Sequence, residues 1–294
     1  MAQSPSQRRP RLDFQLFMPA IAIIKRELLS TLRDRRYFRV MAFALLMLLI
    51  ALVFLFRGDP IDMTDPRAMR ELSTFLFLGY AYTLYAIAML LVPTVASNAI
   101  CSEKQQEQLD LIRMSYISPA VFLLGKAANI LGLYLLTVIA TLHFAGVMFF
   151  FTGIDWMQYL QVLFLIFMAA ASATAVGLLC SAYCYRTIPA AICTYLLVLL
   201  TQGSAVILSL LALAALLENI PTPSWMFSDW PFAFLDVAIP CMGILHLASN
   251  SANPIFFLFV AGYHGGIIVT CGFLAHRLLN CPTTPSPSST EVTR

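Results

Sequence analysis

The sequence predicts an all-α polytopic membrane protein, and three observations carry this prediction. The 294 residues are 60% hydrophobic and only 11% charged, and the mean hydropathy is +0.81, whereas soluble domains are roughly a quarter charged. The charged residues gather in short clusters between apolar runs of about 20 residues, the length of helix that crosses a bilayer. The runs lack the alternating polarity of barrel strands, and backbone groups in hydrocarbon must pair internally, so we predict helices.

Six apolar runs are each long enough to cross the bilayer. They cover residues 37–56, 72–96, 127–151, 157–183, 188–217 and 254–279. The stretch 232–247 is shorter and contains Asp236, Pro240 and His246. Such a segment suits a re-entrant or interfacial position better than a seventh span. We therefore predict six transmembrane helices.

The Lys and Arg residues predict the orientation, because they accumulate in cytoplasmic loops. With six spans, 15 of the 18 fall on one side, nine of them before or at the start of the first run, and only Arg57, Arg67 and Arg70 fall on the other. The loop 218–253 contains neither Lys nor Arg and is predicted to be external. Both termini are therefore predicted to lie in the cytoplasm, and a seventh span would move Arg277 outside. The cell (cytoplasmic or inner) membrane is the expected location.

The chain is expected to divide into three parts. Residues 1–36 form a cytoplasmic N-terminus, 37–280 the transmembrane domain, and 281–294 a Pro/Ser/Thr-rich tail that is predicted to be disordered. Within and just beyond the first part, residues 14–37 place apolar side chains on one face and Lys and Arg on the other. This pattern predicts a helix lying in the membrane interface, although the charges could also serve only to fix the topology.

The sequence lacks common motifs of catalysis and of nucleotide binding. It contains no GxxxxGK[ST], HExxH or GxSxG motif. The seven cysteines lack the spacing of a metal site and are expected to pack. His143 and His264 are also expected to have hydrogen-bonded packing roles, although ionisable residues inside a membrane are functional candidates too. We predict no catalytic, metal or cofactor site.

Residues 97–126 form a polar, helix-competent segment between two apolar runs. Ser102 and Gln105 have the spacing of a capping box, and the following stretch 103–113 has high helix propensity with Leu109 and Ile112 on one face. The sequence therefore predicts a short cytoplasmic helix.

A second helix is predicted to follow within the same segment. Ser118 and Pro119 are typical of an N-cap and a first helical position, so residues 114–117 become an elbow. Gly125 and Lys126 then lie where the next span leaves the interface. A helix, an elbow and a helix projecting from the cytoplasmic face have the shape of a docking lever.

At these residues the chain resembles the membrane subunits of ABC-2 type ABC transporters. That family has a Glu-rich start, a Leu-Glu-Leu-Leu core, a turn with Pro or Ser, and Gly-Lys before the third span. The corresponding residues here are Glu103-Lys104, Leu109-Asp110-Leu111-Ile112, Ser118-Pro119 and Gly125-Lys126. The basic stretch 25–38 and the layout of six spans with a long fifth loop are also similar. The chain departs from the pattern at Glu107-Gln108, where the family has Gly-Thr, and at Tyr116, where it often has Pro.

The resemblance implies a half-transporter that has no ATPase site of its own. Separate ABC ATPase subunits would bind ATP and Mg, so no cofactor is expected on this chain. A second membrane subunit, identical or homologous, would complete the pathway in the lipid bilayer, and no nucleic-acid partner is expected. The residues implied to couple the chain to the ATPase are Glu103, Glu107, Leu109, Asp110, Leu111, Ile112 and Arg113.

The resemblance also indicates where a substrate would pass. In this family the second and fifth spans face the pathway, and here the candidates on them are Thr83, Thr94, Thr201, Gln202 and Ser204. The same small and hydroxyl residues equally suit plain helix packing. A largely uncharged pathway fits an amphipathic or lipid-like cargo better than an ion.

Three hypotheses of different kinds follow from the sequence. The leading one is the permease of an ATP-driven exporter. The second is a non-transporting membrane anchor that uses the same ATPase contact to drive an envelope or motility machine. The third is an intramembrane enzyme or unrelated channel, which would need a polar cluster deep in the spans and an essential His143 or His264.

Overall fold

The described part of the chain is a bundle of long helices. The structure, a computed structural model, describes residues 66–106, 118–152, 156–217 and 254–280, together with residues 39, 42, 46, 49, 50 and 244. These residues contain no strand. The helices are α3 (Pro66–Asn98), α4 (Cys101–Gln105), α6 (Pro119–Thr152), α7 (Trp156–Tyr183), α8 (Thr187–Leu217) and α11 (Pro254–Asn280).

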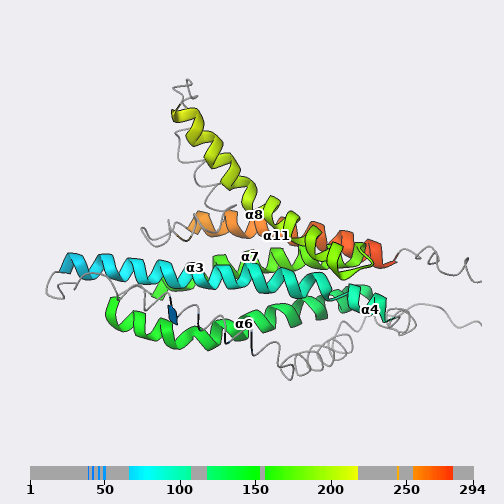
Figure 1. The fold of residues 1–294 in the computed structure, drawn as a ribbon, viewed down its shortest axis with the longest axis horizontal. Helices are drawn as coiled ribbons and strands as arrows, with labels where there is room; N and C mark the ends of the chain where they lie inside the picture. The colour runs from blue at the N-terminus through cyan, green and yellow to red at the C-terminus, as the bar shows by residue number, and fades with distance from the viewer. Residues whose placement is uncertain are drawn as a thin grey trace, which may run out of the picture.

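Helix α7 occupies the centre of this bundle. It contacts α3, α6, α8 and α11, while α3 also packs against α6 and α8. Successive long helices run in opposite directions, so α3, α7 and α11 end where α6 and α8 begin (Figure 1). The short helix α4 lies at this same end of the bundle (Figure 1).

Three helices in the described ranges are long and apolar enough to cross a membrane. They comprise Leu76–Gln105, Pro119–Gly146 and Trp156–Tyr183. They overlap the second and third predicted runs and contain the fourth, so the all-helical, membrane-spanning character of the chain is confirmed for this part. The fifth and sixth predicted runs lie in α8 and α11.

The start of α6 agrees with the expected cap. The helix begins at Pro119, and the backbone N–H of Val121 donates to the Ser118 Oγ at 3.4 Å. A hydroxyl before the first turn accepts one of the amide hydrogens that the helix cannot use internally. Proline at the first position loses no intrahelical hydrogen bond there.

Several predictions fall outside the described residues. They concern the interfacial helix at 14–37, most of the first run at 37–56, the stretch 232–247 apart from Ile244, the loop 218–253 apart from that residue, and the tail 281–294. The domain boundaries, the number of spans beyond the three and the positions of the termini stay predictions.

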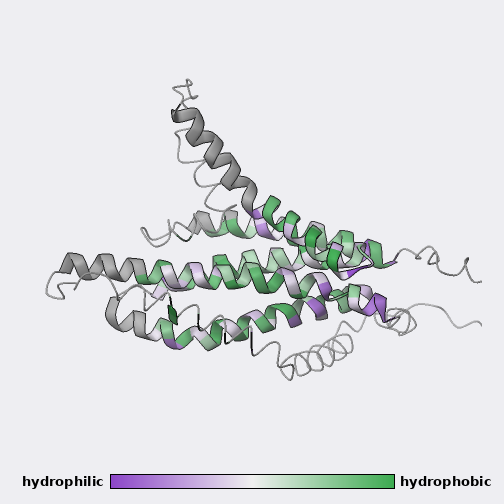
Figure 2. Cartoon of the chain, in the orientation of Figure 1, coloured by the Kyte–Doolittle hydropathy of each residue, from purple (hydrophilic) through white to green (hydrophobic). Residues whose placement is uncertain are grey.

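Polar residues concentrate at the end of the bundle where α4 lies (Figure 2). Lys104 is part of α4, Lys126 lies in the first turns of α6, Arg186 precedes α8, and Arg277 is in the last turn of α11. These four basic residues therefore share one end of the bundle. This agrees with the predicted order of spans two to six, which places all four residues on the same side of the membrane.

Candidate coupling site at one end of the bundle

Helix α4 directly continues the chain reversal at the end of α3. The Ala99 N–H donates to the Ala96 carbonyl at 3.3 Å, and α4 then runs from Cys101 to Gln105. The chain thus turns within a few residues and brings the start of segment 97–126 back against the bundle.

The predicted capping box at Ser102 and Gln105 is wrong. The N-cap position of α4 is Ile100, which has no side-chain cap, and Ser102 lies inside the helix. The Ser102 Oγ donates backward to the Asn98 carbonyl at 2.8 Å. The spacing rule assumes that the serine precedes the helix, whereas here the preceding turn already places Ser102 in the helical part.

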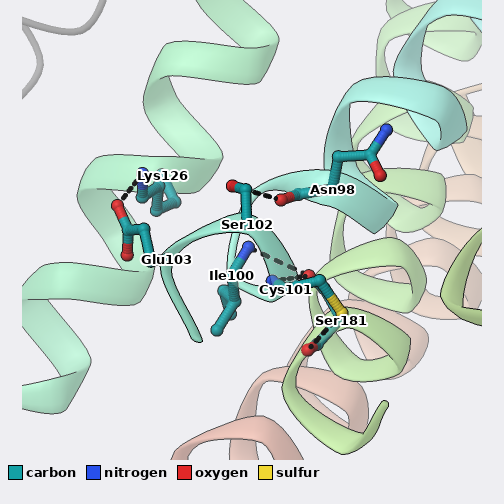
Figure 3. Close-up of polar contacts among 7 residues, drawn as sticks. All are labelled: Asn98, Ile100, Cys101, Ser102, Glu103, Lys126 and Ser181. Carbon is teal, nitrogen blue, oxygen red and sulfur yellow. Dashed lines mark hydrogen bonds and ion pairs between the residues drawn. The ribbon is translucent and has the colours of Figure 1, made fainter. Parts of the chain in front are cut away.

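The amides at the start of α4 are satisfied by another helix instead. The backbone N–H groups of Ile100 and Cys101 both donate to the Oγ of Ser181, each at 2.9 Å (Figure 3). Ser181 lies in the last turn of α7, and all three residues have 0% exposure. A side chain of α7 therefore caps α4.

The side chain of Lys104 binds the backbone carbonyls at the end of α7. Its Nζ donates to the carbonyls of Ser181 at 3.4 Å, of Cys184 at 3.3 Å, and of Ala182. The last carbonyls of a helix lack internal partners and carry partial negative charge, so an ammonium group there is favourable.

On its other side, α4 is joined to α6 by an ion pair. The Glu103 Oε1 lies 2.5 Å from the Lys126 Nζ, and the two side chains are 15% and 10% exposed (Figure 3). The Lys126 ammonium also lies over the Phe122 ring, 5.6 Å from its centroid. Lys126 therefore does not extend into solvent as a plain topology signal would.

The cysteines near this end have packing surroundings. The Cys101 Sγ donates to the carbonyls of Ser181 at 3.4 Å and Cys184 at 3.1 Å. Burial raises the pKa of the Cys184 thiol above its ordinary value. Among the described residues, no group of three or more His, Cys, Asp or Glu is placed to hold a metal ion.

The structure places part of the predicted coupling set. Glu103 is in α4 and Ser118, Pro119, Gly125 and Lys126 are at the start of α6. The remaining predicted coupling residues lie outside the described ranges, namely Glu107, Leu109, Asp110, Leu111, Ile112 and Arg113. The described residues thus define the base from which the coupling segment departs.

The candidate pathway residues have different surroundings. The hydroxyls of Thr83, Thr94 and Thr201 each donate to a carbonyl of their own helix, four residues earlier in the chain. Thr94 is exposed and also forms a 2.6 Å hydrogen bond with the Tyr195 hydroxyl of α8. The side chain of Ser204 is outside the described part. Own-helix bonds are compatible with packing as well as with a pathway.

Gln202 is the centre of a buried polar cluster, which we call the Gln202 cluster. Its Nε2 donates to the Ala169 carbonyl at 3.0 Å and to the Ser172 Oγ at 3.2 Å, and its Oε1 accepts from the Tyr85 hydroxyl at 3.2 Å. A carbonyl can only accept, so the contact with Ala169 fixes the orientation of the amide. The cluster joins α3, α7 and α8.

His264 adds α11 to the same cluster. Its Nδ1 lies 3.0 Å from the Ser172 Oγ, and the residue is 0% exposed. Ser172 has one hydroxyl hydrogen and donates it to the Ala169 carbonyl at 2.9 Å. The hydrogen in the His264 contact must therefore come from Nδ1, which agrees with the expected hydrogen-bonded packing role. Sequence reasoning singled out Gln202 and His264 but missed Tyr85 and Ser172, whose signal is a polar residue inside an apolar run.

Taken together, the fold and the site define a polytopic helical membrane protein with a polar anchoring point at one end of its bundle. The family model described as ABC-2 type transporter matches residues 20–220. The match covers more than half of the chain, so the chain belongs to the ABC-2 type transporter family, and it is a multi-pass protein with the membrane domain of an ABC transporter. This is a permease family, not itself an ATPase. No curated protein matches the chain.

Proposed function

We propose that the chain is the permease subunit of an ATP-driven exporter in the cell membrane. Separate ABC ATPase subunits bind ATP and Mg, and a second membrane subunit, identical or homologous, completes the pathway. Segment 97–126 carries the contact with the ATPase. The observation that supports this most directly is the family match together with the fixed position of α4 at the polar end of the bundle.

The anchoring of α4 supports a coupling role for the residues that follow it. A surface loop helix needs no buried capping by another helix, yet the first amides of α4 are bound by Ser181 and its lysine by the end of α7. Closure of an ATP-binding partner can move the spans only if the segment that connects partner and spans is rigid. Glu107 to Arg113 depart from this fixed base.

The test is copurification from the native membrane in mild detergent. The wild-type chain is expected to retain an ABC ATPase, and Leu109→Ala and Asp110→Lys are expected to lower its recovery at least tenfold, because they remove apolar and acidic contacts. Gln108→Ala is the matched control and is expected to retain the ATPase. Recovery of the wild-type chain without any ATPase, or equal recovery with all variants, would overturn the proposal.

A further inference from the structure

The junction of α4 with the end of α7 is built more firmly than a surface loop requires. Ser181 accepts from two consecutive backbone amides of the α4 start, both at 2.9 Å. Ile100, Cys101 and Ser181 have 0% exposure, so water does not compete for these hydrogen bonds. Displacement of α4 from α7 would leave buried amides unsatisfied, which proteins avoid.

Side chains of α4 also donate to the backbone carbonyls at the end of α7. Lys104 donates to carbonyls of residues 181, 182 and 184, and the Cys101 thiol donates to two of the same carbonyls. Gln105 Nε2 also donates to the Tyr185 carbonyl at 3.4 Å. In all of these hydrogen bonds α4 donates and the end of α7 accepts. Backbone amides of α4 bind a side chain of α7, and side chains of α4 bind backbone carbonyls at the end of α7, so the two elements are joined at several points.

A close contact between α3 and α7 reinforces this junction one helical turn away. Gly177 lies four residues before Ser181, on the same face of α7, and approaches Ala96 near the end of α3. The absence of a side chain at Gly177 lets the two helices come close enough for Ser181 to reach the amides that follow α3.

Helix α7 continues from this junction into the centre of the bundle. It contacts every other long helix of the described part, and Ser172 on it is hydrogen-bonded to His264 of α11 and to Gln202 of α8. Through α7, this junction is therefore connected to helices that have no direct part in segment 97–126.

We propose that Lys104 and Ser181 are positioning residues that transmit movement of the coupling segment to α7. This inference rests on the proposed function, since the movement comes from the ATPase partner. The Glu103–Lys126 ion pair joins α4 to α6, whereas Lys104 and Ser181 make α7 the second element that α4 moves.

The experiment measures the movement of α7 separately from ATPase binding. Spin labels are placed at Tyr183, at the end of α7, and at Leu124 on α6, which are 76% and 68% exposed. The background is a chain whose cysteines other than the buried Cys101 are replaced by serine. The distance between the labels is measured in the complex with the copurified ATPase, with and without ATP and Mg.

Lys104→Met and Ser181→Ala are expected to retain the ATPase at the level of the background but to lose at least half of the ATP-dependent change in distance. The matched controls are Gln106→Met, an exposed residue next to α4, and Thr174→Ala, whose buried hydroxyl donates to a carbonyl of its own helix. Both controls are expected to keep the full change.

The inference would be overturned if the two test variants kept the full ATP-dependent change in distance. Loss of the ATPase from these variants would also overturn it, since that would place the residues in the docking contact. Absence of an ATPase from the background itself would instead overturn the proposed function.

A rescue variant separates transmission from a simple loss of folding. In Ser181→Cys, the new thiol lies beside Cys101, and oxidation with copper phenanthroline is expected to join them and restore the ATP-dependent change that the reduced form lacks. Cys101→Ala combined with Ser181→Cys is the control and should not respond to oxidation. A disulfide that forms without restoring the change would contradict the inference.

Discussion

A methyl group built on Gly177 would lie only 2.4 Å from the Cβ of Ala96, so the backbone of α7 lies directly against the Ala96 side chain of α3 at this point. Two nonbonded carbon atoms cannot lie 2.4 Å apart, so a side chain at position 177 would force one of the helices to shift. Small residues allow such approach between membrane helices, where dispersion contacts rather than water exclusion hold the helices together.

We predict that Gly177→Ala separates α3 from α7 and destabilises the chain. The added methyl meets the Ala96 Cβ, which is attached to backbone and cannot rotate away, so the helices must shift. Overpacking of this kind costs about 1–3 kcal/mol. The expected result is a lower apparent Tm in detergent, measured by intrinsic fluorescence.

Gly262→Ala is the control for this prediction. A Cβ at Gly262 would meet nothing within 4 Å, and alanine is a better helix former than glycine. Its apparent Tm should equal or exceed that of the wild type. Equal melting of the Gly177 and Gly262 variants would show that the close approach does not constrain the bundle.

The helices of this bundle were predictable because their signal is local. Long apolar runs predicted helices at the positions of α3, α6, α7, α8 and α11, because a run that crosses a bilayer must satisfy its backbone internally. The start of α6 was predictable for the same reason, because Ser118 and Pro119 are neighbours and each has a distinct preference at a helix start.

The anchoring of α4 was not predictable, because its partners are far apart in the chain. Ser181 is one more hydroxyl in an apolar run, and no local pattern shows that it accepts from the amides of Ile100 and Cys101. The sequence identified Lys104 as part of the family motif and as one of the basic residues on the cytoplasmic side, but not as a hydrogen-bond donor to the α7 carbonyls. Ser102 was misassigned because local spacing cannot show that α4 continues directly from the preceding turn.

The Gln202 cluster predicts energetic coupling between α3 and α8. Gln202→Leu leaves the Tyr85 hydroxyl without its Gln202 acceptor, and Tyr85→Phe removes the same hydrogen bond from the other side. Hydrogen bonds between membrane helices contribute about 0.6 kcal/mol on average. A double-mutant cycle by equilibrium unfolding in mixed micelles is expected to give a coupling energy of about this size.

Thr201→Val provides the comparison for the cycle. The Thr201 hydroxyl donates within α8, so its removal should not couple to Tyr85→Phe. If the Gln202 and Tyr85 variants were additive to the same degree, the observed 3.2 Å contact would carry no net stabilisation.

The histidines of α6 and α11 are predicted to differ. His264 is 0% exposed and hydrogen-bonded to Ser172, whereas His143 is exposed. His264→Ala should therefore leave a cavity and lower the free energy of unfolding by about 2 kcal/mol or more, while His143→Ala should change it by less than about 0.5 kcal/mol.

The same two variants test the enzyme or channel hypothesis against the packing role. A packing role predicts that His264→Ala lowers stability while the complex with the ATPase, once purified at low temperature, hydrolyses ATP at the wild-type rate. Loss of function with unchanged thermal unfolding, in either variant, would favour a chemical role for that histidine.

The ion pair between Glu103 and Lys126 predicts a non-additive effect of charge removal. The two side chains are largely buried, so Glu103→Gln leaves the Lys126 charge without this partner, and Lys126→Met does the same to Glu103. Removal of one member of a buried pair costs about 3–5 kcal/mol, whereas replacement of both by uncharged groups is often close to neutral. The double variant should therefore unfold at a higher temperature than either single variant, measured by apparent Tm in detergent at constant ionic strength.

The exposed Arg186→Met, which removes a basic charge at the same end of the bundle, is the matched control and should melt like the wild type. Additive losses in the double variant would show that the two charges contribute independently, and that α4 is not held to α6 through this pair.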